Sequence, residues 1–209
     1  MDVKENDDAP RPSRKAQQSE ATRAVLLAEA RRLFADRGYA AVGTEAIVRA
    51  AGVTRGALYH HFDGKQELFR AVYEDVEREL VERVAAHATA AGDPLDALHA
   101  GVRAFLDACE DPAVQRIALI DAPSVLGWEQ WREIDLKYGF GLMHGALAAA
   151  MDAGLIDRQP VRALAHLLLG ALHEAALLVA RADDGGRTRR EVGRALARHL
   201  DALGAPRRG

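Results

Sequence analysis

Apolar residues recur at helical spacing along most of the chain. In the first such run, Leu26, Ala30, Leu33 and Phe34 lie at i, i+4, i+7 and i+8, which places them on one face of a helix. Gly38 follows at the position where a left-handed residue commonly ends a helix. The sequence contains no alternation of apolar and polar residues long enough to predict a strand. The pattern predicts an all-α fold that begins with a helix of about five turns.

Two short helices joined by a glycine are predicted next. Thr44 can cap a helix that ends at Ala51, and Gly52 follows it. Thr54 is a favourable N-cap for another short helix that runs to His61. Two short helices joined by a tight turn are typical of a helix-turn-helix, whose second helix enters the major groove of DNA.

A long helix should connect this module to the rest of the chain. Asp63, followed three residues later by Gln66, matches a capping box and predicts a helix that extends through Val84. Further helices are predicted at about 95–109, 114–121, 128–153, 161–182 and 188–203, with joints at Pro94, Pro112, Pro123 and Pro160. We therefore expect an N-terminal three-helix domain joined by a long helix to a larger helical domain.

Composition and charge divide the chain into three parts. Residues 1–18 mix acids, bases, proline and serine without periodicity and are predicted to form a flexible tail. Residues 19–66 form the predicted helix-turn-helix domain, and residues 67–209 form the helical body. The formal net charge is -3, but residues 11–65 hold ten basic and five acidic side chains. A basic N-terminal module on an acidic body suits a protein that contacts nucleic acid with its N-terminal part.

The stretch GVTRGALYHHFDGKQELF breaks two local rules of helix formation. Gly56 lies within a helix, where glycine costs up to about 1 kcal/mol relative to alanine, and close approach of a partner to the backbone is one reason to accept that cost. Lys65 lies at the positive end of the long helix, where an ammonium is unfavourable unless the helix end and the lysine bind a phosphate together. Local rules that fail together commonly mark a functional site.

Side chains around these two residues can donate hydrogen bonds to DNA. Thr54, Arg55, Tyr59 and His60 face outward if Leu58 and Phe62 face the core. Arg55 is the best candidate for bidentate recognition of guanine. The alternative for each residue alone is an ordinary structural role, in which Tyr59 and His61 complete a small core and Arg55 is a solvated surface residue.

Residues 28–73, AEARRLFADRGYAAVGTEAIVRAAGVTRGALYHHFDGKQELFRAVY, resemble the DNA-binding domain of the TetR family of bacterial transcriptional regulators. The resemblance covers about a quarter of the chain, and the helical body has a suitable length for the ligand-binding and dimerisation domain of that family. It implies that seven residues lie at or near DNA, mostly on phosphates: Thr44, Thr54, Arg55, Gly56, Tyr59, His60 and Lys65. Arg14 and Lys15 are expected to add contacts from the tail, as such extensions do in some members.

The same resemblance implies that the last two helices form a four-helix bundle with a second copy. Two copies are also needed for an operator with half-sites roughly 34 to 36 Å apart. The residues predicted at the dimer interface are Leu164, Leu168, Ala171, Leu172, Ala175, Leu178, Leu196 and Leu200. The alternative is that these apolar stripes are buried within their own chain.

A ligand pocket in the body is likewise implied by the resemblance. Trp128, Trp131 and Asp135 lie at i, i+3 and i+7, so one helical face can present two aromatic rings and a polar anchor. The residues predicted to line the pocket are Phe105, Cys109, Trp128, Trp131, Asp135, Tyr138 and His144. An aromatic stripe is more often part of the core than of a binding site, and the sequence does not identify the ligand.

Several other kinds of site have no support in the sequence. His60 and His61 are adjacent, and His166 and His173 lie two turns apart, so neither pair has the spacing that holds a metal ion from one helix. Cys109 has no second cysteine to pair with, and no phosphate loop or nucleophile elbow is present. We expect no metal, no cofactor and no enzymatic activity.

The N-terminal segment, MDVKENDDAPRPSRK, does not resemble a secretory signal, and histidines and a glutamate interrupt the most apolar segment, 164–180. We expect a cytoplasmic protein without a membrane partner.

The sequence patterns and the resemblance together imply a homodimeric, ligand-responsive transcriptional regulator that binds double-stranded DNA, with repression the mode that the family implies. An activator would have the same sequence features. The alternatives from other classes are a small helical enzyme or binding protein whose N-terminal module serves another partner, and a protein-interaction adaptor that does not bind DNA.

Overall fold

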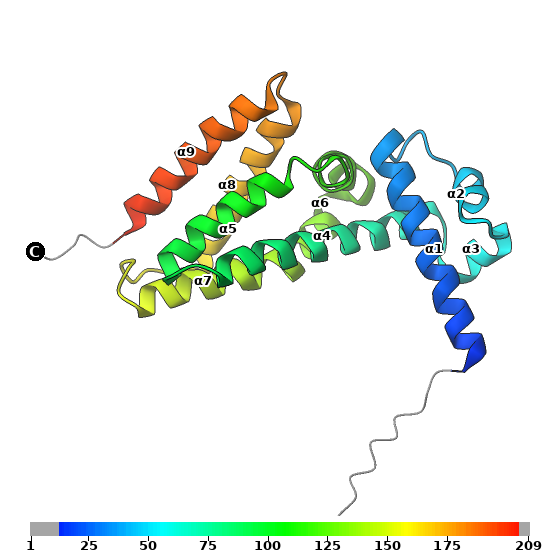
Figure 1. Ribbon diagram of the computed structural model, residues 1–209, viewed down its shortest axis with the longest axis horizontal. Coiled ribbons are helices and arrows are strands. Elements are labelled where there is room, and N and C mark those ends of the chain that lie inside the picture. Colours follow the sequence, from blue (N-terminus) through cyan, green and yellow to red (C-terminus); the bar gives the residue numbers. More distant parts are fainter. Residues whose placement is uncertain (1–12, 205–209) are drawn as a thin grey trace, which may run out of the picture.

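The computed structural model describes residues 13–204, whose regular elements are helices (Figure 1). In chain order they are α1 (Arg14–Arg37), α2 (Thr44–Ala51), α3 (Arg55–His61), α4 (Lys65–Thr89), α5 (Pro94–Ala108), η1 (Val114–Asp121), α6 (Ala122–Asp135), η2 (Leu136–Phe140), α7 (Gly141–Asp152), α8 (Val161–Arg181) and α9 (Gly185–Leu203). Extended backbone in residues 13–204 pairs at one isolated bridge, between Ile156 and Gly204. The all-α prediction is confirmed.

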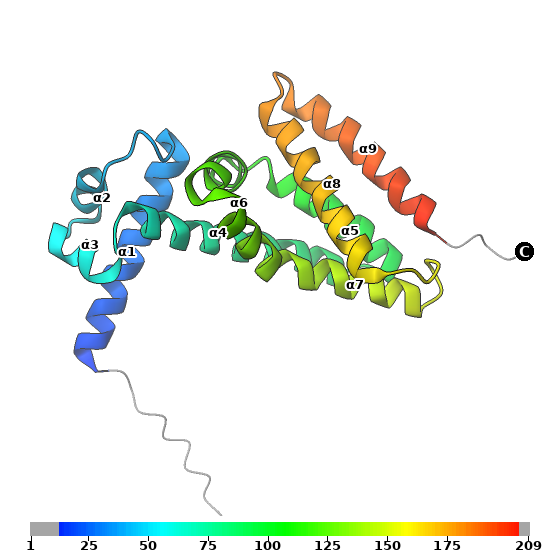
Figure 2. The same ribbon diagram turned by 180° about the vertical axis from the view of Figure 1, so that it is seen from behind.

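The three-helix domain lies at one end of the molecule. Figures 1 and 2 show α1, α2 and α3 grouped there, with α4 leaving the group and running along the body. Within the body α4 packs against α5, and α8 packs against α9. Of the body elements, η1 and α6 lie next to the three-helix domain, whereas α9 lies far from it.

The first helix begins earlier than the sequence predicted. Ser13 is its N-cap, and the hydroxyl of Ser13 accepts a hydrogen bond from the amide of Ala16 at 3.2 Å. Residues 14–18, assigned to a flexible tail, are therefore helical, and that part of the prediction is wrong. The serine cap explains the difference, because it satisfies an amide at the start of α1 despite the polar composition of the segment. The remainder of the predicted tail, 1–12, lies outside the described residues.

The caps of the helix-turn-helix agree with the sequence at α3 and differ at α2. Thr54 caps α3 as predicted, since its hydroxyl accepts a hydrogen bond from the amide of Ala57 at 3.2 Å. Thr44 is not a cap. Gly43 is the N-cap of α2, no side chain caps that helix, and Thr44 is its first helical residue.

The start of α4 is also built differently from the predicted capping box. Gly64 is the N-cap, with φ of 136°, a conformation that favours glycine. The amide of Asp63 donates to the Glu67 carboxylate. The amide group of Gln66 donates to the carbonyl of Val125 at 2.8 Å, so this side chain ties α4 to α6 rather than capping α4.

The predicted single helix over 128–153 is divided into three elements. Helix α6 extends directly from the π-helical segment η1, so Pro123 lies in its first turn and does not mark a joint. The break falls instead at Gly127, where φ is 77°. A second π-helical segment, η2, then separates α6 from α7. Wide π-helical turns are uncommon and occur frequently at functional sites.

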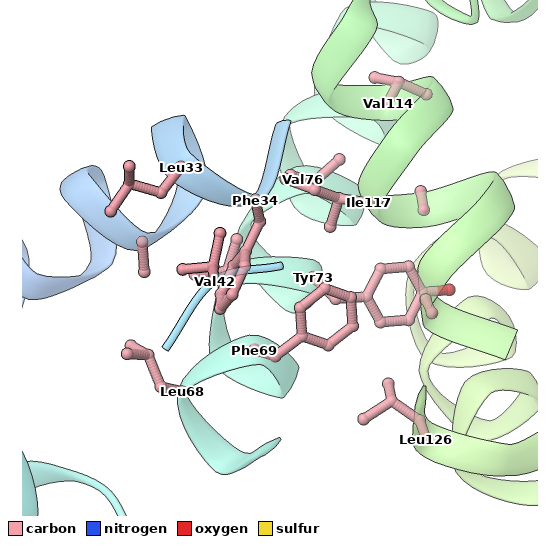
Figure 3. Close-up of a cluster of buried hydrophobic side chains, with 14 of the residues drawn as sticks. Leu33, Phe34, Val42, Leu68, Phe69, Tyr73, Val76, Val114, Ile117 and Leu126 are labelled. Carbon is pink, nitrogen blue, oxygen red and sulfur yellow. The ribbon is translucent and has the colours of Figure 1, made fainter. Parts of the chain in front are cut away.

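One hydrophobic core continues from the three-helix domain into the body. Figure 3 shows Phe34 of α1 beside Phe69 and Tyr73 of α4, with Ile117 of η1 close by. The rings of Phe34 and Phe69 meet edge to face, with centroids 5.2 Å apart. The core therefore crosses the expected domain boundary at residues 66 and 67, and apolar packing holds the two domains together.

Candidate functional site

The outward face of α3 carries the side chains predicted to meet DNA. Thr54, Arg55, Tyr59 and His60 are exposed, and Leu58 is fully buried, as the sequence predicted. The guanidinium of Arg55 lies 5.5 Å from the centroid of the Tyr59 ring, and it also pairs with Glu45 of α2 at 3.3 Å. Arg55 and Tyr59 thus present a guanidinium and an aromatic ring in contact at the protein surface.

The glycine in α3 has no packing partner that explains it. A Cβ atom built at Gly56 meets nothing closer than the Thr54 hydroxyl oxygen, at 3.9 Å, and Gly56 is not in a left-handed conformation. The folded chain would accommodate alanine there. The close approach of another molecule to the backbone at Gly56 stays a prediction.

Lys65 has a role that sequence reasoning did not find. Its ammonium donates to the carbonyls of Tyr39 at 2.9 Å and Val42 at 3.0 Å, and it lies 3.8 Å from the centroid of the Tyr39 ring. The carbonyls and the ring offset the unfavourable position at the N-terminus of α4. An ammonium has three donors, so one N–H is left for a phosphate. The predicted DNA contact stays a prediction, while the structural role is clear.

Thr44, Arg14 and Lys15 complete the set of predicted DNA contacts. Thr44 is half-buried in the first turn of α2, and Arg14 and Lys15 are exposed in the first turn of α1. Figure 1 shows that the N-terminal part of α1 extends beyond α2 and α3. The two basic residues are therefore carried by a helix and not by a tail.

A polar contact joins the three-helix domain to the body. The amide of Tyr39, in the loop between α1 and α2, donates to a carboxylate oxygen of Asp121 at 2.7 Å. The same oxygen of Asp121 accepts from Nε of Arg116 at 3.3 Å, and Asp121 is largely buried. We call Tyr39, Arg116 and Asp121 the interdomain contact.

Gly38 makes room for this contact. Its φ of 77° is favourable for glycine, and a Cβ atom there would lie 2.0 Å from a terminal nitrogen of Arg116. Arg116 is thus packed directly against the backbone at the end of α1. A side chain at Gly38 would strain the backbone and displace Arg116.

The body contains a narrow cavity between α4, α5, α7 and α8. The empty space between its lining atoms is about 800 Å³, which includes the open mouth of the cavity. The centre of a water molecule fits in only about 80 Å³ of this space, so the cavity is narrow. Its lining residues are Glu77, Leu80, Val81, Val84, Ala88, Ala97, Leu98, Gly101, Val102, Phe105, Leu119, Asp135, Gly139, Leu142, Met143, Ala146, Leu169, Leu172 and His173. An apolar cavity with a few polar groups is typical of a small-molecule site.

The polar residues of the lining are Glu77, Asp135 and His173, which come from α4, α6 and α8. One carboxylate oxygen of Asp135 lies 2.8 Å from Nε2 of His173, and the other accepts from a terminal nitrogen of Arg132 at 2.6 Å. Both oxygens of Asp135 are therefore occupied. Nδ1 of His173 is buried without a hydrogen-bond partner among the described residues.

Glu77 is the unusual member of this group. Only 8% of Glu77 is exposed, and its carboxyl group makes no ion pair within residues 13–204. Burial, with the charge of Asp135 as the next cause, raises the pKa of Glu77 to about 7, and His173 opposes that rise. A buried carboxyl that titrates near neutrality and faces a cavity is characteristic of a functional site.

Two of the seven predicted ligand residues, Phe105 and Asp135, line the cavity. Cys109 is buried in the core instead, and burial raises the pKa of its thiol to about 12. The hydroxyl of Tyr138 donates to the carboxylate of Glu74 at 3.3 Å, and His144 packs on the ring of Phe140. Neither lies in the lining, because the π-helical segment η2 rotates this part of the chain relative to the continuous helix that the sequence predicted.

The two tryptophan rings pack together, with centroids 5.1 Å apart, but they do not line the cavity with Asp135. Trp128 is 67% exposed, whereas Trp131 is buried against His173, with ring centroids 5.4 Å apart. Both line a separate surface hollow that shares Leu119 and His173 with the internal cavity. Trp131 therefore contacts His173, which lines the cavity, but does not line the cavity itself.

Sequence reasoning missed Glu77 and His173 as cavity residues. Glu77 lies on the apolar side of α4, between Val76 and Leu80, so an acid at a buried helical position was a usable signal. For His173 the sequence shows only its spacing from His166, which does not suit a metal ion held by one helix. No local pattern shows that these two residues meet, because α4 and α8 are distant in sequence.

The predicted dimer-interface residues divide into two groups. Leu164, Leu172, Ala175, Leu196 and Leu200 are buried in a core shared by α5, α7, α8 and α9. For these five the structure shows the alternative, burial within the chain, because α8 packs against α7 and α9, and α9 packs against α5.

The other predicted residues remain available on the surface. Ala171 and Leu178 are exposed, and Leu168 is half-buried. Leu167, which is not among the predicted interface residues, lies on the same helix and is 72% exposed. Leu167, Ala171 and Leu178 lie at i, i+4 and i+11 and form what we call the outer row of α8.

Two further findings concern the predictions of no metal ion and no membrane partner. In the part of the chain that the structure describes, no group of three His, Cys, Asp or Glu is arranged to hold a metal ion. Helix α8 is long and apolar enough to cross a membrane by length and composition alone. Core helices share that composition, and Leu164, Ala165 and Ala176 of α8 are buried against neighbouring helices.

The second helix, α3, is capped by Thr54 and faces outward, and hydrogen bonds from Lys65 hold the loop before α2. This arrangement is that of a DNA-binding regulator of the helix-turn-helix class. Residues 26–72 match the model for bacterial regulatory proteins of the TetR family. Residues 95–203, about half of the chain, match the model described as tetracyclin repressor-like, C-terminal domain. The chain belongs to the TetR family.

Known proteins of this family resemble the chain along most of its length. A TetR-family transcriptional regulator from Pectobacterium atrosepticum, solved by crystallography, is 34% identical, with 93% of this chain and 99% of that chain covered and a TM-score of 0.82. The TetC protein of transposon Tn10 from Escherichia coli is 28% identical over 69% of this chain and 73% of its own length.

Another relative matches over a shorter part. The transcriptional activator FasR from Mycolicibacterium smegmatis is 40% identical over 42% of this chain, which corresponds to 40% of its own length. The chain thus spans less than half of FasR, although it spans nearly three quarters of TetC.

Proposed function

We propose that this protein is a homodimeric repressor that binds a near-palindromic operator in double-stranded DNA and releases it when a small molecule enters the cavity. The observation that carries this proposal is the double role of η1. Leu119 lines the cavity, and Asp121, two residues later, holds the amide of Tyr39 in the three-helix domain. One short segment therefore contacts both the cavity and the DNA-binding domain.

Helix α4 provides a second connection of the same kind. Glu77 lines the cavity, and Lys65 at the start of the same helix holds the loop that contains Tyr39 and Val42. A ligand that enters this narrow cavity must move α4 relative to the helices that pack against it. Such a ligand favours the conformer with the wider cavity and shifts the population only by the difference between its affinities for the two conformers. The two α3 helices of a dimer would then lose the spacing that an operator requires.

The outer row of α8 supports dimerisation. Leu167 and Leu178 are large apolar side chains that are 72% and 49% exposed, and Ala171 between them lets another helix approach closely. Exposed apolar residues in a row on one helix suit association with a second copy of the chain. Leu167, Ala171 and Leu178 are therefore proposed to replace the five buried residues of the predicted interface.

Repression is proposed over activation because the family model that covers the body is described as tetracyclin repressor-like. Activation is the second candidate, since FasR is named an activator and is similar in the N-terminal part. A regulator of transcription acts where the DNA is, so the proposed location is the cytoplasm.

The first experiment measures binding of the purified protein to fluorescent DNA from upstream of its own gene, by anisotropy and over a range of salt concentrations. Binding that is tight, falls steeply with salt and is far weaker on a scrambled duplex supports the proposal. Binding that is equally weak on both duplexes moves the operator elsewhere, and no binding at any salt concentration, with or without added ligand, contradicts it.

The variant for this experiment is Tyr59→Ala and not a substitution of Lys65. Lys65 also stabilises the loop before α2, so its removal would lower DNA affinity through the fold. Tyr59 is exposed, and its removal leaves the core intact. Tyr59→Ala should weaken binding on every sequence by a similar factor, because phosphate contacts carry no sequence information.

A further inference from the structure

Glu77 and Asp135 are two carboxylates at one end of the same cavity, and their environments differ. Asp135 has a partner for each oxygen, in Arg132 and His173. Glu77 has no ion-pair partner among the described residues although its side chain is almost entirely buried. A buried carboxylate without a counter-ion is costly, and it is normally kept where a ligand supplies the missing charge or hydrogen bonds.

The cavity is elongated, with its polar groups gathered at one end. Along α4 its wall runs from Glu77 through Leu80 and Val84 to Ala88. The eleven helical steps from Glu77 to Ala88 correspond to about 16 Å. Apart from Glu77, Asp135 and His173, every lining residue is apolar. A slender molecule with one polar end and an apolar chain therefore matches the cavity better than a molecule that is polar throughout.

The balance of charge at the polar end selects the polar group. Arg132 already neutralises Asp135, and the carboxyl of Glu77 is the acidic group left over. The groups that face Glu77 are Tyr73 on its own helix, Cys109 at the end of α5, Asp135 on α6 and His173 on α8. Burial raises the pKa of Tyr73 and of Cys109, so both are neutral at physiological pH, and Nε2 of His173 is directed to Asp135. None of the four supplies Glu77 with a full positive charge of its own.

We propose that the effector is a slender apolar amine, whose protonated nitrogen binds the carboxylate of Glu77 and whose carbon chain lies along α4 toward Ala88. This inference rests on the proposed function and adds the chemical class of the ligand. An anionic ligand would place its charge beside Glu77 and Asp135 in an apolar cavity, which is strongly unfavourable. A neutral alcohol fills the same space but leaves Glu77 without a counter-ion.

The test uses three probes of equal chain length on the full-length protein: n-hexylamine, hexan-1-ol and hexanoate, each titrated by calorimetry at pH 8. Hexylamine should bind at least about tenfold more tightly than hexanol, because a hydrogen bond to a charged partner is worth more than one to a neutral partner. Hexanoate should bind most weakly of the three. Equal binding of the amine and the alcohol, tighter binding of hexanoate, or no binding of any probe overturns the proposal.

Glu77→Gln is the decisive variant, since glutamine keeps the shape and removes the charge. The advantage of hexylamine over hexanol should fall to less than about threefold, whereas hexanol itself should change little. Glu74→Gln is the matched control on the same helix. Glu74 lies outside the cavity and pairs with Lys137 at 3.1 Å, so this variant should keep the preference for the amine. Retention of the full preference in Glu77→Gln overturns the proposal.

Ala146→Leu shows whether the probes occupy the cavity. Ala146 lines the cavity from α7, and the added volume should weaken the two probes that bind, the amine and the alcohol, by a similar factor. If hexylamine binding is unaffected by this variant, the amine lies elsewhere and the proposal is wrong.

Operator release by the same three probes separates the ligand class from the proposed function. Release by hexylamine alone supports both. Release by hexanoate or hexanol without a preference for the amine leaves a ligand-responsive regulator whose ligand is not an amine. Tight binding of hexylamine that depends on Glu77 but does not weaken operator binding supports the amine site and contradicts release by a ligand of this class.

Discussion

The amide of Tyr39 donates to the carboxylate of Asp121 across 82 positions of sequence, at 2.7 Å. This contact ties the loop before α2 to the end of η1, the segment that also carries Leu119 into the cavity wall. Because Asp121 is largely buried, loss of its carboxylate leaves the amide of Tyr39 without a partner at the boundary between domains.

Asp121→Ala should therefore weaken the attachment of the DNA-binding domain. Removing the acceptor should lower the free energy of unfolding by about 1–3 kcal/mol and accelerate hydrogen exchange at the Tyr39 amide. Asp121→Asn, which keeps an oxygen acceptor, should have a smaller effect. The amide of Ala57, bonded to Thr54 within the helix-turn-helix, is the internal reference and should not change. Unchanged exchange at Tyr39 in the alanine variant would show that the contact does not hold the loop.

Gly56→Ala should stabilise the free protein and weaken its binding to DNA. The site has room for the methyl group, so the variant gains up to about 1 kcal/mol in helix propensity, measurable by denaturant unfolding. Gly145→Ala in α7, where a Cβ atom also meets nothing within 4 Å, is the matched control. It should raise stability by a similar amount and leave DNA affinity unchanged. Equal DNA affinity in both variants would mean that no partner approaches Gly56 closely.

Glu77→Gln should raise stability at high pH. The pKa of Glu77 is raised from 4.5 to about 7 in the folded protein, so folding favours its protonated form. The stability that this preference provides is complete below about pH 4.5 and is lost as the pH rises to 7. At pH 8 the variant should exceed the parent by a free energy of unfolding on the order of 3 kcal/mol, and at pH 5 by no more than about 1 kcal/mol.

Urea unfolding at the two pH values measures this difference. Glu74→Gln is the control on the same helix and should not raise stability at pH 8, because it removes a carboxylate that pairs with Arg70 and Lys137. A gap between Glu77→Gln and the parent that is equal at pH 5 and pH 8 would place the pKa of Glu77 near its ordinary value.

Leu167→Glu should convert a dimer into a monomer. A charge in the outer row of α8 would be buried between two copies without a partner. Light scattering coupled to size exclusion gives the mass directly. Val25→Glu is the matched control, because Val25 is 44% exposed but lies on α1. A parent protein that is monomeric, or a Leu167→Glu variant that stays dimeric, would count against the outer row as the interface.

Local signals in the sequence were sufficient for most helices and for the face of α3. The bounds of α2, Thr44–Ala51, and of η1, Val114–Asp121, are those predicted, and Thr54 is the predicted cap. These features depend on apolar periodicity and on hydrogen bonds between residues three or four apart. Such interactions are present in the sequence itself, whatever the rest of the chain does.

The cavity and the exposed surface depended on contacts between distant residues. Glu77, Asp135 and His173 come together from three helices, and the π-helical segment η2 directs Tyr138 and His144 away from the cavity. On α8 the sequence showed apolar residues on more than one side of the helix, but it did not show which side the body would cover. Leu164 was therefore predicted at the dimer interface but lies in the core, whereas Leu167 is exposed. The sequence determined the helices and their apolar stripes. The tertiary structure decided which stripe is buried and which polar groups meet, because burial is a property of the packed helices together and not of any one of them.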